Sequence, residues 1–179
     1  MKAITGRFNL FLAITALAVL CGCQTTNKPT NKQDKEVSAL RVHIEANSDN
    51  TGTSQSISLL RSDPMPFTIA KEPILTEAGI IAARVINTQG GFAVEIQFDE
   101  ISGLVLEQYS AANPGKHFVI FGQWGEKPAE GRWLAAPYIT RRIPGGRLSF
   151  TPDMSREEAD RLVLGLNNVA KKTLKGQLK

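Results

Sequence analysis

The chain of 179 residues has few of the side chains that carry metal or nucleophilic chemistry, with only two cysteines and two histidines. Both cysteines, Cys21 and Cys23, lie near the N-terminus, so the remaining chain has no disulfide and no thiol nucleophile. Neither His43 nor His117 has a second metal-ligating side chain at the usual spacing. We therefore expect no metal and no cofactor. We expect His117, which lies beside apolar residues of a predicted strand, to be structural rather than a ligand.

Motifs of common enzyme sites are also missing. The sequence has no G-x-S-x-G elbow and no G-x-x-x-x-G-K-[ST] loop, and Gly90-Gly91 and Gly145-Gly146 are typical of turns. Two acidic pairs, Asp99-Glu100 and Glu157-Glu158, lie at predicted helix starts, where negative charge complements the helix dipole. A Ser-His-Asp site that assembles only in the fold stays open, because sequence does not show its geometry.

The apolar stretch from Phe8 to Leu20 is too short to span a membrane, which takes roughly 20 apolar residues. Lys2 and Arg7 precede this stretch, and no acidic residue occurs before Asp34. This pattern predicts an export signal peptide at residues 1–22.

Leu20-Cys21-Gly22-Cys23 resembles a lipobox, so we expect Cys23 to carry the lipid, palmitate included, that anchors the mature chain to a membrane. An ordinary secretory signal or an uncleaved anchor are the alternatives, and both still place the domain outside the cytoplasm. Gln24, not Asp, follows Cys23. In a source with two membranes this favours the periplasmic face of the outer one. In a source with one membrane, we expect the protein on its outer face.

The charge is nearly balanced once the signal is removed. Loss of Lys2 and Arg7 reduces the 21 basic residues to 19, against 17 acidic ones, for a net charge of +2. This balance gives no electrostatic case for nucleic acid as a partner. Residues 171–179 form a basic tail, interpreted as a solvated helix end or as a contact with anionic head groups. Its lysines are Lys171, Lys172, Lys175 and Lys179.

The polar segment after Cys23 has no apolar cluster, so residues 23–39 are predicted to be the lipidated cysteine and a flexible tether. Residues 40–170 have the size of one globular domain. Within them, alternating apolar residues and turn signals predict strands. We expect these at residues 40–46, 57–60, 67–70, 80–86, 92–98, 117–121, 132–139 and 147–150.

Two helices are expected among these strands. Asp99 is a predicted cap for a helix over residues 100–112, with Ile101, Val105 and Tyr109 on its apolar stripe. Ser155 and Glu158 form a predicted capping box for the last helix. Antiparallel strands with two amphipathic helices indicate an α+β fold, a two-layer sandwich.

Six segments between Pro73 and Asn168 match, in order, the motifs of one known family. They are Glu72–Ala78, Phe92–Phe98, Ile101–Ala112, Gly115–Ile120, Ala135–Ile139 and Ser155–Ala159. Together they resemble the periplasmic head subdomain of the SecD/SecDF preprotein translocase. The resemblance implies a ferredoxin-like sandwich, with an antiparallel sheet and two main helices on one face. It also implies contact with polypeptide that emerges on the outer side of a membrane.

The chain also departs from the family. In SecD the subdomain is inserted between membrane helices that perform proton-driven work, and we find a single predicted lipid anchor in their place. Proton-coupled translocation is therefore not carried over. The segment Gln123–Arg132 is also longer than the family's tight turn.

Five residues are candidates for partner recognition: Trp124, Trp133, Tyr138, Arg141 and Arg142. Aromatic and arginine side chains are enriched at binding hot spots. Trp124 borders a loop with Gly and Pro, where core packing or plain exposure are the alternatives to binding. Arg141-Arg142 precedes a Pro-Gly-Gly turn and also fits a solvated corner.

These observations favour a non-catalytic, lipid-anchored binding module of the cell envelope. Its expected partner is secreted or unfolded polypeptide, or an envelope protein complex. An envelope hydrolase with a site hidden in the fold and a purely structural lipoprotein are the alternatives.

Overall fold

The computed structural model describes residues 36–47, 52–125 and 130–177. The predicted signal peptide, the lipid acceptor Cys23 and most of the predicted tether lie outside the described residues, as does Lys179. Val37 already belongs to the first strand, so the ordered fold begins before residue 40, its expected start.

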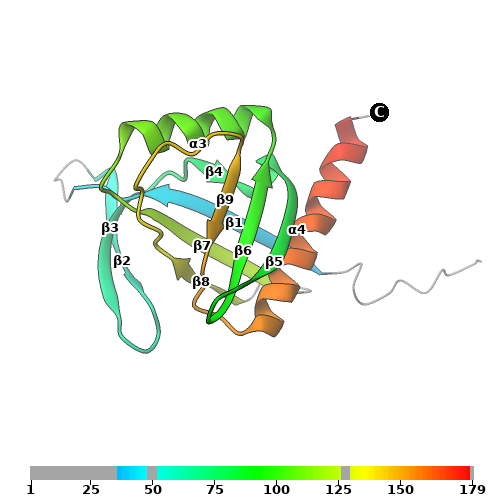
Figure 1. Ribbon diagram of the computed structural model, residues 1–179, viewed down its shortest axis with the longest axis horizontal. Coiled ribbons are helices and arrows are strands. Elements are labelled where there is room, and N and C mark those ends of the chain that lie inside the picture. The colour runs from blue at the N-terminus through cyan, green and yellow to red at the C-terminus, as the bar shows by residue number, and fades with distance from the viewer. Residues whose placement is uncertain (1–35, 48–51, 126–129, 178–179) are drawn as a thin grey trace, which may run out of the picture. The chain divides into compact units, whose positions relative to one another are not determined.

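The described chain forms strands, one short 3-10 helix and two α-helices (Figure 1). The strands are β1 (Val37–Ile44), β2 (Ser54–Leu59), β3 (Met65–Ala70), β4 (Leu75–Thr76), β5 (Ile80–Thr88), β6 (Gly91–Phe98), β7 (Phe118–Gly125), β8 (Glu130–Ala135) and β9 (Arg147–Phe150). The helices are η1 (Glu77–Gly79), α3 (Glu100–Ala112) and α4 (Arg156–Gln177).

The strands pair in three antiparallel sheets. One has the order β4-β1-β7-β8, a second β5-β6-β9, and β2 pairs with β3 in a hairpin. Antiparallel sheets with two helices confirm the α+β class. The ferredoxin-like detail is not confirmed, because the described strands are distributed over separate sheets.

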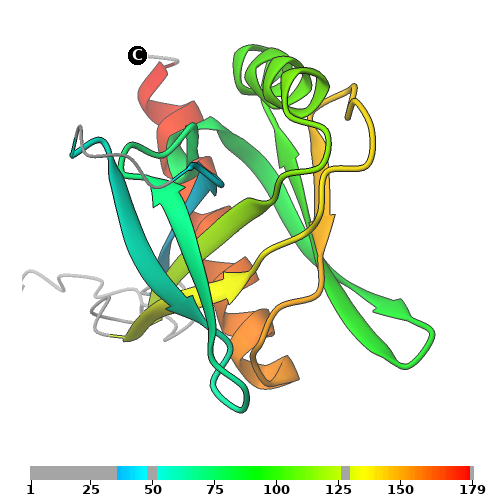
Figure 2. The same cartoon turned by 90° about the vertical axis from the view of Figure 1, so that its left-hand side faces the viewer.

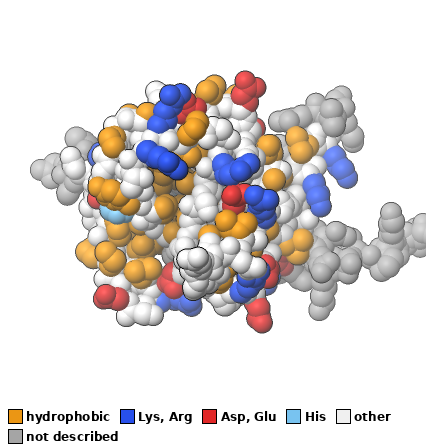
Figure 3. All heavy atoms as spheres, viewed as in Figure 1, with side chains coloured by type: hydrophobic (Ala, Val, Ile, Leu, Met, Phe, Trp, Pro, Cys, Tyr) orange, Lys and Arg blue, Asp and Glu red, His pale blue; other side chains and the backbone are white. Residues whose placement is uncertain are grey.

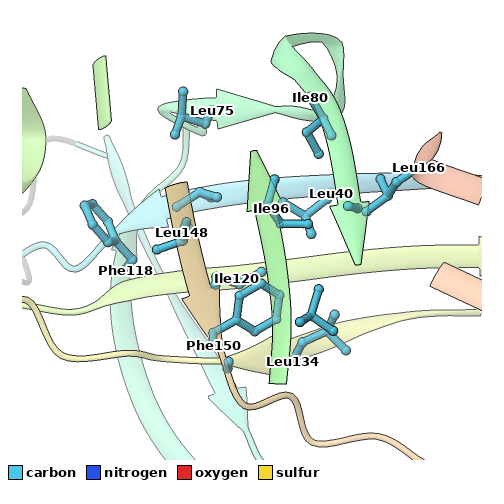
Figure 4. Packing of buried hydrophobic residues seen from close by; sticks show 14 of the residues in the cluster. Leu40, Leu75, Ile80, Ile96, Phe118, Ile120, Leu134, Leu148, Phe150 and Leu166 are labelled. Atoms are coloured by element: carbon cyan, nitrogen blue, oxygen red, sulfur yellow. The ribbon is translucent and has the colours of Figure 1, made fainter. Parts of the chain in front are cut away.

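The centre of the four-stranded sheet is the pair β1–β7, which keeps one register from Val37↔Gly125 to Ile44↔Phe118. Alternation along β1 turns Leu40 and Val42, both fully buried, to the core side. Figure 4 shows how side chains of this sheet meet those of the three-stranded sheet, with Leu40, Ile120 and Leu134 on one side and Ile96, Leu148 and Phe150 on the other. The core therefore lies between the two sheets, and the other face of the four-stranded sheet is left for other contacts.

Helix α3 starts as predicted, and Val105 and Tyr109 of its predicted apolar stripe are partly buried and pack against the core. The Asp99 carboxylate accepts a hydrogen bond from the Ser102 N–H at 2.7 Å, which confirms the cap. The buried residues, however, are Gly103, Leu106 and Ser110. Ile101, which was expected on the apolar stripe, is 76% exposed. The physical reason is the close approach at Gly103, where an added Cβ would lie 3.1 Å from the Gly146 Cα.

Helix α4 confirms the predicted capping box. The Ser155 hydroxyl accepts from the Glu158 N–H at 3.2 Å, and the Glu158 carboxylate accepts from the Ser155 N–H at 2.7 Å. Leu162 and Leu166 of this helix are buried against the sheets. The turn between β5 and β6 also follows the prediction, with Gly90 at a φ of +90°.

Candidate binding groove

The outer face of the four-stranded sheet carries a group of aromatic rings. Because alternate residues of β1 and β7 point to opposite faces, His43 and Phe121 point away from the core. Trp133 of β8 pairs with Phe121 in the sheet. Its ring lies edge-on to both neighbours, with centroids 5.3 Å from His43 and 5.2 Å from Phe121. This edge-on geometry is the preferred packing of aromatic rings.

The β2–β3 hairpin crosses this outer face, as Figure 2 shows, and β3 contacts β1 while β2 contacts β8. Beside the hairpin is a groove of about 480 Å³. We call it the aromatic groove. Its walls include the rings of His43, Phe121 and Trp133 and the charged side chains of Arg41, Lys71 and Glu72. It combines apolar surface with charged groups, which is the usual make-up of a binding cleft.

His43 contributes an uncharged ring to the groove. Its Nδ1 donates to the Ala70 carbonyl oxygen at 2.8 Å, which requires the tautomer with a proton on Nδ1. Burial lowers the pKa of His43 below its ordinary value of 6.5, and the hydrogen bond to Ala70 opposes this with a smaller effect. At neutral pH the ring is therefore neutral, and it packs against Trp133 with only 5% of its surface exposed.

A second aromatic cluster lies on the side of the molecule where β3 runs. The His117 ring stands edge-on between Phe67 and Tyr138, with centroid distances of 5.2 and 5.1 Å. The Glu45 carboxylate accepts from the His117 N–H at 3.0 Å and lies 2.6 Å from Nδ1 of the ring. Tyr138 is 56% exposed. Figure 3 shows hydrophobic side chains gathered around a histidine on this side.

Trp124 is fully buried and lies in the core, so the hypothesis that it binds a partner is corrected. Strand β7 continues to Gly125, beyond its predicted end at Phe121. Trp124 therefore has the same parity as Ile120, which faces the core, and its indole ring stacks under the Arg132 guanidinium at 4.8 Å.

The other four predicted residues are distributed over different parts of the surface. Trp133 lines the aromatic groove, and Tyr138 belongs to the neighbouring cluster. Arg141 and Arg142 are exposed outside the groove, and Arg142 forms an ion pair with Glu107.

Sequence reasoning missed His43, Phe121, Arg41 and Lys71 as groove residues. A signal was present, because the alternation in residues 40–46 already placed Arg41 and His43 on the face opposite the core. What the sequence did not provide was the pairing partner. Phe121 joins His43 only through the β1–β7 register, and Lys71 only through the position of the hairpin.

None of the helices in the described ranges is long and apolar enough to cross a membrane. No group of three or more His, Cys, Asp or Glu side chains in these ranges is arranged to hold a metal ion.

One family matches most of the chain. A family model described as the SecDF P1 head subdomain matches residues 54–170, which is more than half of the chain. Two solved structures share the fold. A crystal structure of SecDF in a super-membrane-facing form has a TM-score of 0.51 at 21% identity, over 73% of this chain. A second, of a membrane component SecDF that enhances protein export, has a TM-score of 0.52 at 18% identity, over 94% of this chain and 71% of that one.

The chain spans only 19% of the first of these SecDF structures. No curated protein matches the chain.

Proposed function

Because this chain belongs to the SecDF P1 head subdomain family, we propose that it is a non-catalytic module that binds secreted or unfolded polypeptide outside the cytoplasm. One similar structure is described as a membrane component that enhances protein export. Membership of the family supports a role related to protein translocation. The proposal for this chain is limited to the head's contact with polypeptide, since the chain spans a small part of SecDF.

The aromatic groove is the observation that carries the proposal. An unfolded chain exposes apolar side chains that a folded protein buries, and partly exposed rings of Trp133 and Phe121 offer apolar surface to them. Arg41 and Lys71 at the same groove add hydrogen-bond donors for carbonyl and carboxylate groups. Such a site would bind polypeptides that expose apolar side chains and carbonyl groups, whatever their exact sequence.

We further propose that the module is held at a membrane by a lipid on Cys23. The support is the lipobox-like sequence and the polar segment that follows it. The 12 residues between Cys23 and Glu36 limit the distance between these two positions to at most roughly 45 Å, the length of a fully extended chain. The groove would then work close to the lipid surface, on the periplasmic face of the outer membrane if the source has two membranes.

Photo-crosslinking of the intact, lipidated chain tests this function. A photoreactive amino acid at Trp133 places the probe in the groove, and one at Tyr138 places it in the neighbouring cluster. Lys171, exposed on α4, is the control position. Recovery of nascent secreted chains or translocase components from Trp133, above the level at Lys171, supports the proposal. Equal recovery at both positions contradicts it. Recovery of a folded envelope complex alone would show that the partner is that complex and not unfolded polypeptide.

A further inference from the structure

Strand β9 is an edge of the three-stranded sheet, because β6 pairs with it on one side only. Its position is fixed by Leu148 and Phe150, which are buried in the core. Two other sheet edges in the described ranges are covered: the Asn167 side chain bonds to the edge of β5, and the Ala46 N–H donates to the Thr68 carbonyl oxygen at the edge of β3. The edge of β9 has no comparable closure there.

The register shows which main-chain groups of β9 point outward. The Phe98 N–H donates to the Gly146 carbonyl oxygen at 2.8 Å, so this opposed pair is hydrogen-bonded. In an antiparallel ladder such pairs alternate with non-bonded ones. Leu148 is the next bonded position, and its main chain points toward β6. The N–H and C=O groups of Arg147 and Ser149 therefore point to the free edge.

An open slot of about 370 Å³ adjoins this edge. Ser149, Phe150 and Thr151 line one side, and the segment Ala135–Pro137 lines the other. None of these lining residues is charged, so the slot offers main-chain groups, the hydroxyl groups of Ser149 and Thr151, and apolar side chains. An extended main chain is the ligand that matches outward donors and acceptors repeated every second residue.

We propose that an extended segment of polypeptide adds to β9 as a fourth strand of this sheet, hydrogen-bonded to the main chain of Arg147 and Ser149. This inference rests on the proposed function, because the partner is the same unfolded polypeptide. Main-chain pairing does not depend on sequence, which suits a partner whose side chains vary. The aromatic groove then selects apolar side chains, and the β9 edge binds the backbone.

Residue-resolved amide hydrogen exchange tests the pairing in the intact chain held in mild detergent. The probe is a reduced and alkylated model protein that stays unfolded. On binding, exchange slows at Arg147 and Ser149 and is unchanged at Leu148, which is already bonded to β6. Slowing at Trp133 without any at Arg147 or Ser149 overturns this inference and leaves the proposed function standing. Absence of any binding overturns both.

The variant Ser149→Pro removes the outward N–H and leaves the bonds to β6 in place. We expect it to weaken binding of the unfolded probe by roughly threefold to tenfold, the effect of one hydrogen bond. Ser149→Thr keeps the N–H and is the matched control. Binding by a folded Ser149→Pro chain with the affinity of the control would overturn the pairing. If that variant does not fold, the exchange pattern of the unchanged chain decides the question.

Discussion

Asn167 completes the edge of β5 by bonding both main-chain groups of Ala83. The amide oxygen of Asn167 accepts from the Ala83 N–H at 2.9 Å, and its amide nitrogen donates to the Ala83 carbonyl oxygen at 2.9 Å. The side chain thus takes the place of a neighbouring strand just beyond the register shift between Ile80 and Ala82.

The Asn167→Ala variant should lower the free energy of unfolding by about 1–3 kcal/mol, because it leaves two main-chain groups without these partners. Urea unfolding followed by circular dichroism measures the loss. Lys171→Ala, on an exposed position of the same helix, is the control and should change little. Equal midpoints for the two variants would show that water replaces the amide without cost.

Gly165 lies where α4 comes closest to β1. A Cβ at this position would lie 2.1 Å from the Ser38 Oγ, 2.7 Å from the Ser38 N and 2.8 Å from the Val37 carbonyl carbon. We expect Gly165→Ala to destabilise the protein by about 1–3 kcal/mol through overpacking, which outweighs the helix propensity gained. A Cβ at Gly176 of the same helix would meet no other segment of the described chain within 4 Å, so Gly176→Ala should be neutral or stabilising by up to about 1 kcal/mol. Unfolding midpoints that rise for both variants would refute the close approach.

His43 makes stability depend on pH in a defined direction. Because burial lowers the pKa of His43 in the folded state, the unfolded chain takes up this proton at a higher pH. The contribution of His43 to the free energy of unfolding is constant at pH values well above its ordinary pKa of 6.5. It is lost as the pH falls below that value. Arg41 acts in the same direction as burial, and Glu72 opposes it.

Stability is therefore compared between pH 7.5 and 5 for the wild type and for His43→Gln, whose amide still has a donor for Ala70. The wild type should lose more stability over this range than the variant. Parallel curves would mean that His43 titrates alike in the folded and unfolded states.

The two tryptophans should report different environments. In Trp133→Phe the remaining Trp124 is fully buried, so its fluorescence should resist quenching by acrylamide. In Trp124→Phe the remaining Trp133 is partly exposed and should be quenched more readily. The truncation Trp124→Ala should also cost roughly 3–5 kcal/mol of stability, as for a large core side chain. Strong quenching of Trp124 would place its ring outside the core.

The features that could be predicted from the sequence are those that depend on neighbouring residues. The cap at Asp99, the capping box of Ser155 with Glu158, and the turn at Gly90 each depend on residues within four positions of one another, and all three are present as expected. Their hydrogen bonds form between neighbours in the chain, so no knowledge of the tertiary fold is needed.

Features that depend on pairing between distant segments could not be predicted from the sequence. Trp124 is buried because β7 runs four residues beyond Phe121. These four residues pair with residues 37–40 of β1, which lie more than 80 positions earlier in the chain. Ile101 is exposed because Gly103 approaches Gly146 in another loop. In both cases periodicity gave the spacing of the apolar residues but not the side from which their neighbours would come.

The position of β1 has a practical meaning for the limits of an autonomous folding unit. The family match starts at residue 54, yet β1 lies inside the four-stranded sheet, with β4 and β7 on its two sides. A chain cut at residue 54 would lose this inner strand and expose the apolar surface that Leu40 and Val42 cover. Glu36 even pairs with Arg161 of α4 at 3.0 Å, so the smallest piece that keeps every one of these contacts begins at Glu36.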